Sequence, residues 1–122
     1  MSRILVVEDD ADMANLAIRW LERAGYAVQR TADGSAALKA LEGDPLPDLV
    51  LLDVMLPKMD GFEVLRRMRA TARTKRLPVI MVTSFSRDKD ATRGRELGAN
   101  DYIVKPLMEL DFLKRVEHIL KD

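Results

Sequence analysis

Short apolar runs alternate with longer amphipathic segments five times along this chain of 122 residues. The apolar runs predict strands at 3–8, 26–31, 48–53, 78–83 and 101–104, and the amphipathic segments predict helices at 11–24, 34–42, 61–70, 88–97 and 109–121. Strands separated by helices pair in parallel, because each helix carries the chain back along the sheet before the next strand begins. The pattern therefore predicts an α/β fold, with a parallel sheet covered by helices on both faces, in a single domain over residues 1–122.

Residues typical of helix ends stand at the borders of the first three predicted helices. Asp10, Asp33 and Asp60 precede these helices, where an aspartate side chain accepts hydrogen bonds from free main-chain N–H groups. We therefore interpret Asp10 and Asp60 as caps rather than as ligands. Gly25 and Gly43 follow the first and second helices and are expected to end them.

Two of the helices carry apolar stripes that are expected to face the core. The stripe of the first helix is Met13, Ala17, Trp20, Leu21 and Ala24, and that of the last is Phe112, Leu113, Val116, Ile119 and Leu120. Trp20 is interpreted as a core residue rather than as an anchor at an interface. The fourth helix has few apolar residues and contains Gly94, which costs ~1 kcal/mol relative to alanine. It is expected to be loosely held, either as a solvated face or as an element that a switch moves at low cost.

The composition excludes several classes of function. Twenty basic and twenty acidic residues balance, which argues against a domain that binds nucleic acid through phosphate contacts. The basic residues of segment 66–76 are interpreted as a solvated face, because Phe62, Leu65 and Met68 take the buried side of that helix. The absence of cysteine and the single His118, interpreted as a surface residue, exclude a thiolate nucleophile and a cluster of histidine ligands. No apolar run approaches the ~20 residues of a transmembrane helix, so we expect a soluble, cytoplasmic protein whose partners are proteins.

Oxygen-bearing side chains follow three of the predicted strands. Glu8 ends the first predicted strand and Asp9 follows it, Asp53 ends the third, and Thr83 ends the fourth. Because the carboxyl ends of parallel strands meet at one edge of a sheet, these side chains are expected to converge. Converging carboxylates either bind a hard cation or repel one another, and oxygen ligands favour magnesium, manganese or calcium over zinc. The sequence therefore predicts a metal-assisted acidic pocket around Asp53.

Four segments resemble, in order, the active-site segments of response regulator receiver domains. They are residues 4–10, 51–61, 82–84 and 98–106, and they span nearly the whole chain. The resemblance implies the flavodoxin-like (βα)5 fold, doubly wound with strand order 2-1-3-4-5. It also implies a two-component phosphorelay function, in which an aspartate accepts a phosphoryl group from a sensor histidine kinase, a phosphotransfer protein or a small phosphodonor.

By this resemblance, Asp53 is the phosphoryl acceptor. Asp9 and Asp53 would bind Mg²⁺ directly, Glu8 would bind it through water, and the main-chain carbonyl of Met55 would be a further ligand, with Mn²⁺ as an alternative ion. The physical requirement agrees with this assignment, since a carboxylate that attacks an anionic phosphoryl group needs a divalent ion to neutralise charge. Mg²⁺ keeps several waters when it is bound by few carboxylates, which suits this small set.

The resemblance also assigns the residues that respond to the phosphoryl group. Lys105 would bring a positive charge and Thr83 a hydroxyl group to the phosphoryl oxygens, and Lys105–Pro106 is a candidate cis peptide bond. Thr83 and Tyr102 match the two switch residues of the family, whose movement changes the surface formed by the fourth helix, the fifth strand and the fifth helix. That surface is expected to contact a downstream protein or an effector domain.

Two departures from the family pattern bear on function. Many members have aspartate in place of Glu8, whose longer side chain is expected to shift the water-mediated contact with the metal. Met55 and Phe85 are apolar at positions that flank the path of the water attacking the acyl phosphate. We expect these two residues to exclude that water or to leave it unoriented, so that the phosphorylated form hydrolyses slowly.

The sequence therefore predicts a phosphorylation-controlled switch rather than an enzyme that releases a product. Its expected partners are a histidine kinase or phosphotransfer protein and a downstream protein, with no direct contact to nucleic acid or membrane; a dimer that forms on phosphorylation is left open. No effector or DNA-binding domain is recognised in the chain, which suggests either a stand-alone regulator or a receiver cut from a larger protein.

Three alternative functions fit the sequence less well. An aspartate-nucleophile phosphatase of the haloacid dehalogenase type would carry a second acid at the position of Met55. A flavodoxin-like cofactor binder would have a loop rich in Ser, Thr and Gly at Glu8-Asp9-Asp10, where three carboxylates would instead repel a phosphate. A degenerate receiver that serves only as an interaction module would lack part of the site, which is complete here.

Overall fold

Five strands and five helices alternate along the chain in the computed structural model, which describes residues 2–84 and 88–121. The strands are β1 (Arg3–Val7), β2 (Ala27–Thr31), β3 (Leu49–Asp53), β4 (Val79–Thr83) and β5 (Asp101–Val104). The helices are α1 (Ala11–Arg23), α2 (Gly34–Ala40), α3 (Gly61–Ala70), α4 (Asp88–Glu96) and α5 (Glu109–Leu120). The predicted alternation is confirmed, with element ends shifted by one or two residues.

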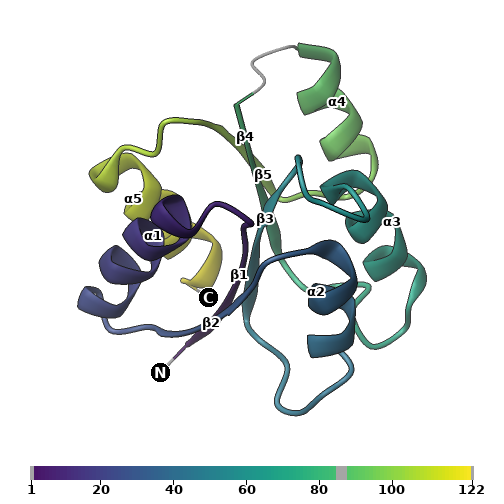
Figure 1. The fold of residues 1–122 in the computed structure, drawn as a ribbon, viewed down its shortest axis with the longest axis horizontal. Coiled ribbons are helices and arrows are strands. Elements are labelled where there is room, and N and C mark those ends of the chain that lie inside the picture. Colours follow the sequence, from purple (N-terminus) through teal and green to yellow (C-terminus); the bar gives the residue numbers. More distant parts are fainter. Residues whose placement is uncertain (1, 85–87, 122) are drawn as a thin grey trace.

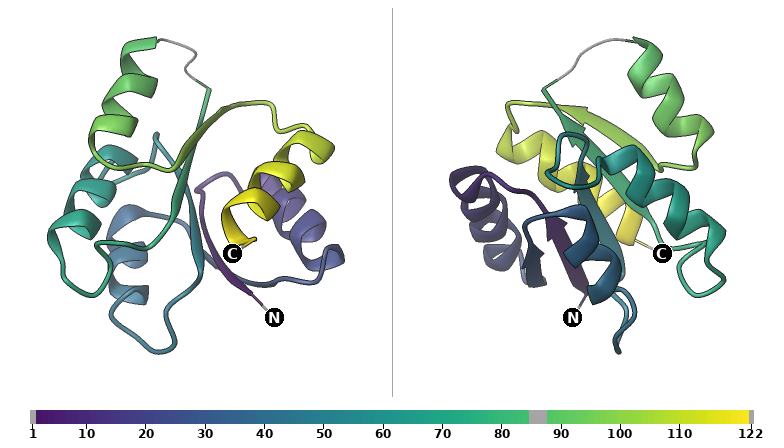
Figure 2. Two further views of the ribbon diagram at one scale, coloured as in Figure 1. Left: turned by 180° about the vertical axis from the view of Figure 1, so that it is seen from behind. Right: turned by 45° about the vertical axis from the view of Figure 1, so that its right-hand side comes forward.

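The strands form one parallel sheet in the order β2-β1-β3-β4-β5. The predicted strand order is therefore confirmed. Helices α1 and α5 lie on one side of the sheet and α2, α3 and α4 on the other (Figure 1), and the two further views show the same division (Figure 2). Because all strands are parallel, their carboxyl ends lie at the same edge, with β3 in the centre and β1 and β4 beside it.

Two hydrophobic clusters form the core, one on each face of the sheet, because successive strand residues point to opposite faces. Val50 and Leu52 of β3 face α2 and α3, whereas Leu49 and Leu51 face α1 and α5. All residues of β3 are buried, which explains why its sequence reads as a continuous apolar run rather than as an alternating one.

Helices α1 and α5 pack together, as their apolar stripes predict. The rings of Trp20 and Phe112 lie 6.1 Å apart between centroids, so Trp20 is partly buried and packs against the core, as predicted. One member of the predicted stripe was placed wrongly: Ala24 is exposed. It is the residue that caps the end of α1, where the chain turns away before β2.

The predicted aspartate caps are confirmed. Asp10 accepts hydrogen bonds from the main-chain N–H groups of two α1 residues, Asp33 accepts one at the start of α2, and Asp60 accepts one at the start of α3. Gly25 follows α1 with φ of 99°, a left-handed conformation that glycine adopts without strain.

The prediction that Gly43 ends α2 is wrong, because this helix ends at Ala40 and is capped by Leu41. The guanidinium of Arg73 donates to the main-chain carbonyls of Leu41 and Gly43 and also binds the carboxylate of Asp44. A tertiary contact from the segment after α3 therefore satisfies the carbonyls at this helix end, which a local glycine signal cannot predict.

Helix α4 makes few buried contacts, as its composition predicts. Among those α4 residues whose side chains the structure describes, only Gly94 is buried. A methyl group at this glycine would meet Met81 Sδ at 3.4 Å and Tyr102 Cδ2 at 3.5 Å, so the helix packs its glycine closely against β4 and β5. The guanidinium carbon of Arg93 lies 4.3 Å from the ring centroid of Phe62, which links α4 to α3.

Most of the remaining surface predictions are confirmed. The side chains of Phe62, Leu65 and Met68 are buried, and Arg66, Arg67, Lys75 and Arg76 are exposed. Arg69 departs from the predicted solvated face, because it is half-buried and its guanidinium donates to the main-chain carbonyls of Thr74, Leu77 and Gly98. His118 is exposed. Within the described part of the chain, no helix is both long and apolar enough to cross a membrane.

Candidate functional site

Three carboxylates meet at the carboxyl edge of the sheet. Glu8 and Asp9 directly follow β1, and Asp53 ends β3, the neighbouring strand, in which Leu52 is paired with Val7. Each of the three offers an oxygen atom, and these oxygens all lie within 4.8 Å of one another. Glu8 and Asp53 are 7% and 4% exposed, whereas Asp9 is exposed to solvent. The predicted convergence at this edge is what the structure shows.

Lys105 brings a positive charge into this acidic cluster. Its Nζ lies 2.8 Å from Glu8 Oε1 and 3.3 Å from Asp53 Oδ2. The side chain comes from the end of β5, where the main-chain N–H of Lys105 donates to the carbonyl of Thr83 at 2.7 Å. The peptide bond between Lys105 and Pro106, the candidate named from the sequence, is cis, and so is the bond between Asp44 and Pro45, which was not predicted.

The charges and donor atoms of the cluster fit a hard divalent cation. When all three carboxylates are ionised, they and the ammonium group leave two negative charges, the charge that one divalent ion would balance. All of the donors are oxygens, the ligands that Mg²⁺ and Mn²⁺ prefer. The residues that could hold such an ion are therefore Glu8, Asp9 and Asp53.

The surroundings of Asp53 raise the pKa of its carboxyl group. Burial raises its pKa to about 7, the hydrogen bond and charge of Glu8 act in the same direction, and Lys105 and the N–H group of Met55 only partly oppose them. A cavity of about 20 Å³ below the carboxylates is lined mainly by apolar side chains, including Leu51 and Phe112, so this side of the site has a low polarity. For Lys105, burial opposes the charged form, but the hydrogen bond to Glu8 and the two carboxylates raise the pKa above its usual value.

We expect Asp53→Asn to stabilise the metal-free protein in a pH-dependent way. A carboxyl group whose pKa is raised in the folded state contributes stability when protonated, and this contribution is lost as the pH rises from 3.8, the ordinary pKa of an aspartate, to about 7. Asparagine stays neutral throughout. The gain in the free energy of unfolding should therefore be small near pH 4 and reach up to about 4 kcal/mol at pH 8.

Urea melts of the wild type and of Asp53→Asn, in the presence of a chelator at acidic and alkaline pH, would measure this difference. A gain of equal size at both pH values would contradict the assignment of the raised pKa to Asp53. Adding Mg²⁺ at pH 8 should then stabilise the wild type and leave Asp53→Asn nearly unchanged, because a ligand stabilises only the form that binds it.

The other residues predicted from the sequence lie around the cluster at different depths. Thr83 is completely buried at the end of β4, the strand next to β3. The side chain of Met55 is 56% exposed, and its main-chain N–H donates to Asp53 Oδ1 at 3.3 Å. Tyr102 is half-buried and packs against the core cluster under α2 and α3. Phe85 lies outside the described residues.

Two residues that contact the site were not predicted. Gly61 packs so closely under β3 that a methyl group there would overlap the main-chain oxygen of Asp53. Arg30 binds the main-chain carbonyls of Glu8 and Asp9 from β2. A glycine shortly after a candidate site residue is a weak signal for such a close approach, whereas the contact of Arg30 depends on which strand lies beside β1.

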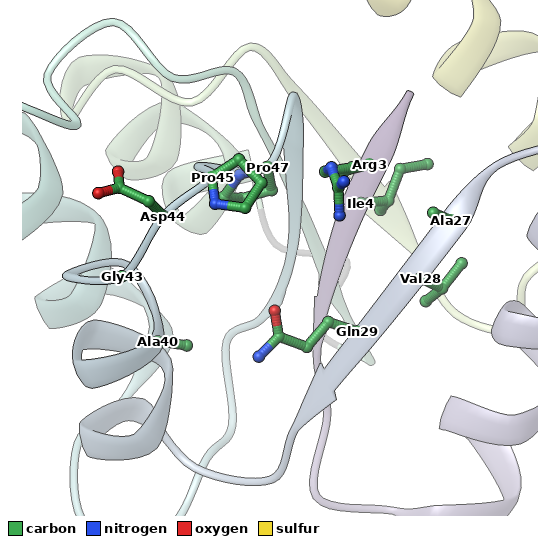
Figure 3. A pocket seen from close by; sticks show the side chains of 10 residues that line it. All are labelled: Arg3, Ile4, Ala27, Val28, Gln29, Ala40, Gly43, Asp44, Pro45 and Pro47. Atoms are coloured by element: carbon green, nitrogen blue, oxygen red, sulfur yellow. The ribbon is translucent and has the colours of Figure 1, made fainter. Parts of the chain in front are cut away.

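A larger cavity, of about 260 Å³, opens at the opposite end of the sheet (Figure 3). It lies between the starts of β1 and β2 and the segment that joins α2 to β3, and its lining includes Arg3, Gln29 and Pro45. Its one acidic side chain, Asp44, is paired with Arg73. The cavity has no cluster of carboxylates, so it is separate from the acidic site.

Known proteins are similar to this chain over nearly its whole length. The family model described as response regulator receiver domain matches residues 4–117. The chain is 42% identical over 121 residues to the DNA-binding dual master transcriptional regulator RpaA of Synechocystis, covering 99% of this chain and 50% of that protein. The chain therefore spans about half the length of this curated relative.

Two solved structures with a bound metal ion have the same fold. The receiver domain of the sensor histidine kinase PA1611 from Pseudomonas aeruginosa PAO1, with a magnesium ion coordinated in its active site cleft, superposes with a TM-score of 0.90 at 29% identity, covering 99% of this chain and 98% of that one. The Mn²⁺-bound form of the response regulator Rcp1 has a TM-score of 0.83 at 33% identity, covering 98% and 91% of the two chains.

Proposed function

Because this chain belongs to the response regulator receiver domain family, we propose that it is a phosphorylation-controlled switch in which Asp53 accepts the phosphoryl group. The observation that carries the proposal is the cluster itself: the carboxylate oxygens of Glu8, Asp9 and Asp53 lie within 4.8 Å of one another, and Lys105 is in contact with Asp53. The reaction would depend on Mg²⁺, with Mn²⁺ as a substitute, as the metal-bound relatives support.

The residues of the site have distinct proposed roles. Asp9 and Asp53 would hold the ion directly, Glu8 would hold it through water, and the main-chain carbonyl of Met55 would be a further ligand. The ion, when bound, supplies charge neutralisation between the carboxylates and the phosphoryl oxygens. An oxygen of Asp53 forms a bond to phosphorus while the bond from phosphorus to the donor breaks, and the donor group leaves with the electron pair of that bond. Lys105 stays within reach of the phosphoryl oxygens and stabilises their charge.

Thr83 and Tyr102 would pass the change on to the surface. A phosphoryl group adds negative charge and acceptor oxygens that only one conformation of the Thr83 hydroxyl satisfies, which biases a two-state equilibrium. Tyr102 lies between the core and Gly94 of α4, so a change in its position alters how α4 packs. The surface formed by α4, β5 and α5 is the proposed output.

The proposed partners follow from this role. A sensor histidine kinase or a phosphotransfer protein would supply the phosphoryl group, and a downstream protein or effector domain would contact the output surface. We propose no direct contact of residues 1–122 with nucleic acid or membrane, since their formal charge is balanced. A dimer formed on phosphorylation and a cytoplasmic location belong to the same proposal.

The proposal is tested by incubating the protein with Mg²⁺ and a small phosphodonor and measuring its intact mass. We expect the mass of one phosphoryl group to be added and lost again on alkaline hydrolysis, as an acyl phosphate requires. The same incubation with a chelator should add almost none. Failure of the wild type to gain mass with a donor that phosphorylates another receiver domain would refute the proposal.

The residues beside the acceptor should set how long the phosphoryl group is retained. We expect the double variant Met55→Asn, Phe85→Glu to hydrolyse its acyl phosphate faster than the wild type by roughly an order of magnitude, because polar groups there can orient the attacking water. The decay of phosphorylated protein after removal of the donor measures this rate. A wild-type lifetime that is already short and that these substitutions fail to shorten would contradict the role of Met55 and Phe85.

A further inference from the structure

Arg30 connects the edge strand β2 to the acidic cluster. Its Nε and Nη2 donate to the main-chain carbonyl of Glu8 at 3.1 and 2.8 Å, and Nη2 also donates to the carbonyl of Asp9 at 3.3 Å. The two carbonyls belong to consecutive residues, and both residues supply carboxylates to the cluster. We infer that Arg30 is a positioning residue for the metal site, which holds the main chain after β1 so that the carboxylate of Asp9 stays beside Asp53. The inference rests on the proposed metal-dependent function.

The main chain at Asp9 needs such support because main-chain pairing with β2 stops just before it. The N–H of Glu8 donates to the carbonyl of Thr31 at 3.1 Å, and α1 begins at Ala11. The guanidinium of Arg30 therefore binds the carbonyls of Glu8, the last residue of the β1–β2 pairing, and of Asp9, which lies between this pairing and the helix. A planar guanidinium can bind two carbonyls with fixed geometry, which a lysine side chain cannot do.

Asp9 depends on its main chain more than Glu8 does. The carboxylate of Glu8 is buried and bound by Lys105 and by the N–H of Asp10. The side chain of Asp9 is exposed, and within residues 2–84 and 88–121 no hydrogen bond holds its carboxylate. The position of this carboxylate is therefore set by the main chain that Arg30 binds.

A positioning role and a purely electrostatic effect of Arg30 predict opposite changes in Mg²⁺ affinity when Arg30 is replaced. A positive charge close to a cation site weakens cation binding, so removing it should strengthen binding if charge were its main effect. If positioning dominates, removing Arg30 should weaken binding, because loss of groups that orient metal ligands typically costs 10–100-fold in affinity. We expect the second result, near the lower end of that range, because Arg30 acts through the main chain.

The test is a calorimetric titration of the whole chain with Mg²⁺, without phosphodonor and well below the melting temperature. We expect the dissociation constant of Arg30→Met to rise about tenfold and that of Arg30→Lys to rise less. Phosphorylation of both variants should approach the wild-type rate when Mg²⁺ is saturating. Amide hydrogen exchange of Asp9 and Asp10 should be faster in both metal-free variants than in the wild type.

Two control variants separate position from charge and from general stability. Gln29→Met changes the neighbouring exposed residue of β2, and Arg3→Met removes one positive charge at the other end of β1. Both should bind Mg²⁺ like the wild type. Equal or tighter binding by Arg30→Met, or by Arg30→Lys if the methionine variant does not fold, would overturn the inference and leave the proposed function intact. A wild type that binds no Mg²⁺ would overturn both.

Discussion

Asp53→Asn is expected to abolish phosphoryl incorporation, with a decrease of at least about a hundredfold in the amount of phosphorylated protein. Asparagine has nearly the size and shape of aspartate but its amide is a poor nucleophile and a weaker metal ligand. The variant should keep the fold, because the ionised carboxylate of Asp53 is itself destabilising. Burial and Glu8 disfavour its charged form and raise its pKa to about 7. Intact mass after incubation with Mg²⁺ and a small phosphodonor measures the effect.

Asp10→Asn is the matched control for this variant. Asp10 directly follows Glu8 and Asp9, but its side chain caps α1, a role that asparagine fills equally well. The control should therefore be phosphorylated like the wild type.

Asp9→Asn should need more Mg²⁺ than the wild type and reach the wild-type extent of phosphorylation only at a high Mg²⁺ concentration. Phosphorylation of Asp53→Asn at the wild-type extent would place the acceptor elsewhere.

Gly61→Ala is expected to damage the site without changing any of its polar groups. The added methyl would overlap the main-chain oxygen of Asp53 and lie 2.9 Å from the Cα of Val54, atoms of the central strand end that cannot move independently of the sheet. The N–H of Gly61 also donates to the carbonyl of Val54 at 2.8 Å, so the two segments are held together. We expect a loss of about 2–3 kcal/mol in the free energy of unfolding.

Denaturant unfolding of Gly61→Ala and its phosphorylation rate at saturating Mg²⁺ would measure the two consequences. The rate should fall even where the variant is fully folded, because relief of the overlap displaces Asp53 from Lys105. Gly43→Ala is the control, since a methyl there meets only the carbonyl of Ala40 at 3.5 Å and the residue has an ordinary φ. An unchanged unfolding free energy in Gly61→Ala would show that the close approach to Asp53 is not maintained in solution.

Much of the fold was predictable because it depends on local patterns. The run Leu49–Asp53 is apolar on both faces, as only a central parallel strand requires, and all of it is buried. The caps at Asp10, Asp33 and Asp60 were also predictable, since each acts on main-chain groups two or three residues away. The end of α2 could not be predicted in this way, because Arg73 stabilises it from 32 residues away in the sequence.

The members of the acidic site were predictable for a related reason. In a parallel sheet every strand ends at the same edge, so residues that follow strands converge there, whatever the distances between them in the sequence. This is why Glu8, Asp9, Asp53 and Lys105 could be grouped before their contacts were known. Their roles in phosphoryl transfer came from the resemblance to a family and stay predictions until the experiments above are made.

The sequence by itself determined the class of fold, the strand ends that carry chemistry and the residues available there, because these follow from hydrophobic periodicity and from the types of side chain. Only the tertiary structure decided how the site is supported. Arg30 reaches Glu8 from a strand 22 residues away, Gly61 lies against the main chain of Asp53, and burial beside Glu8 raises the pKa of Asp53. Each of these depends on distances between separate elements, which the packing of the sheet and helices sets and a one-dimensional pattern does not contain.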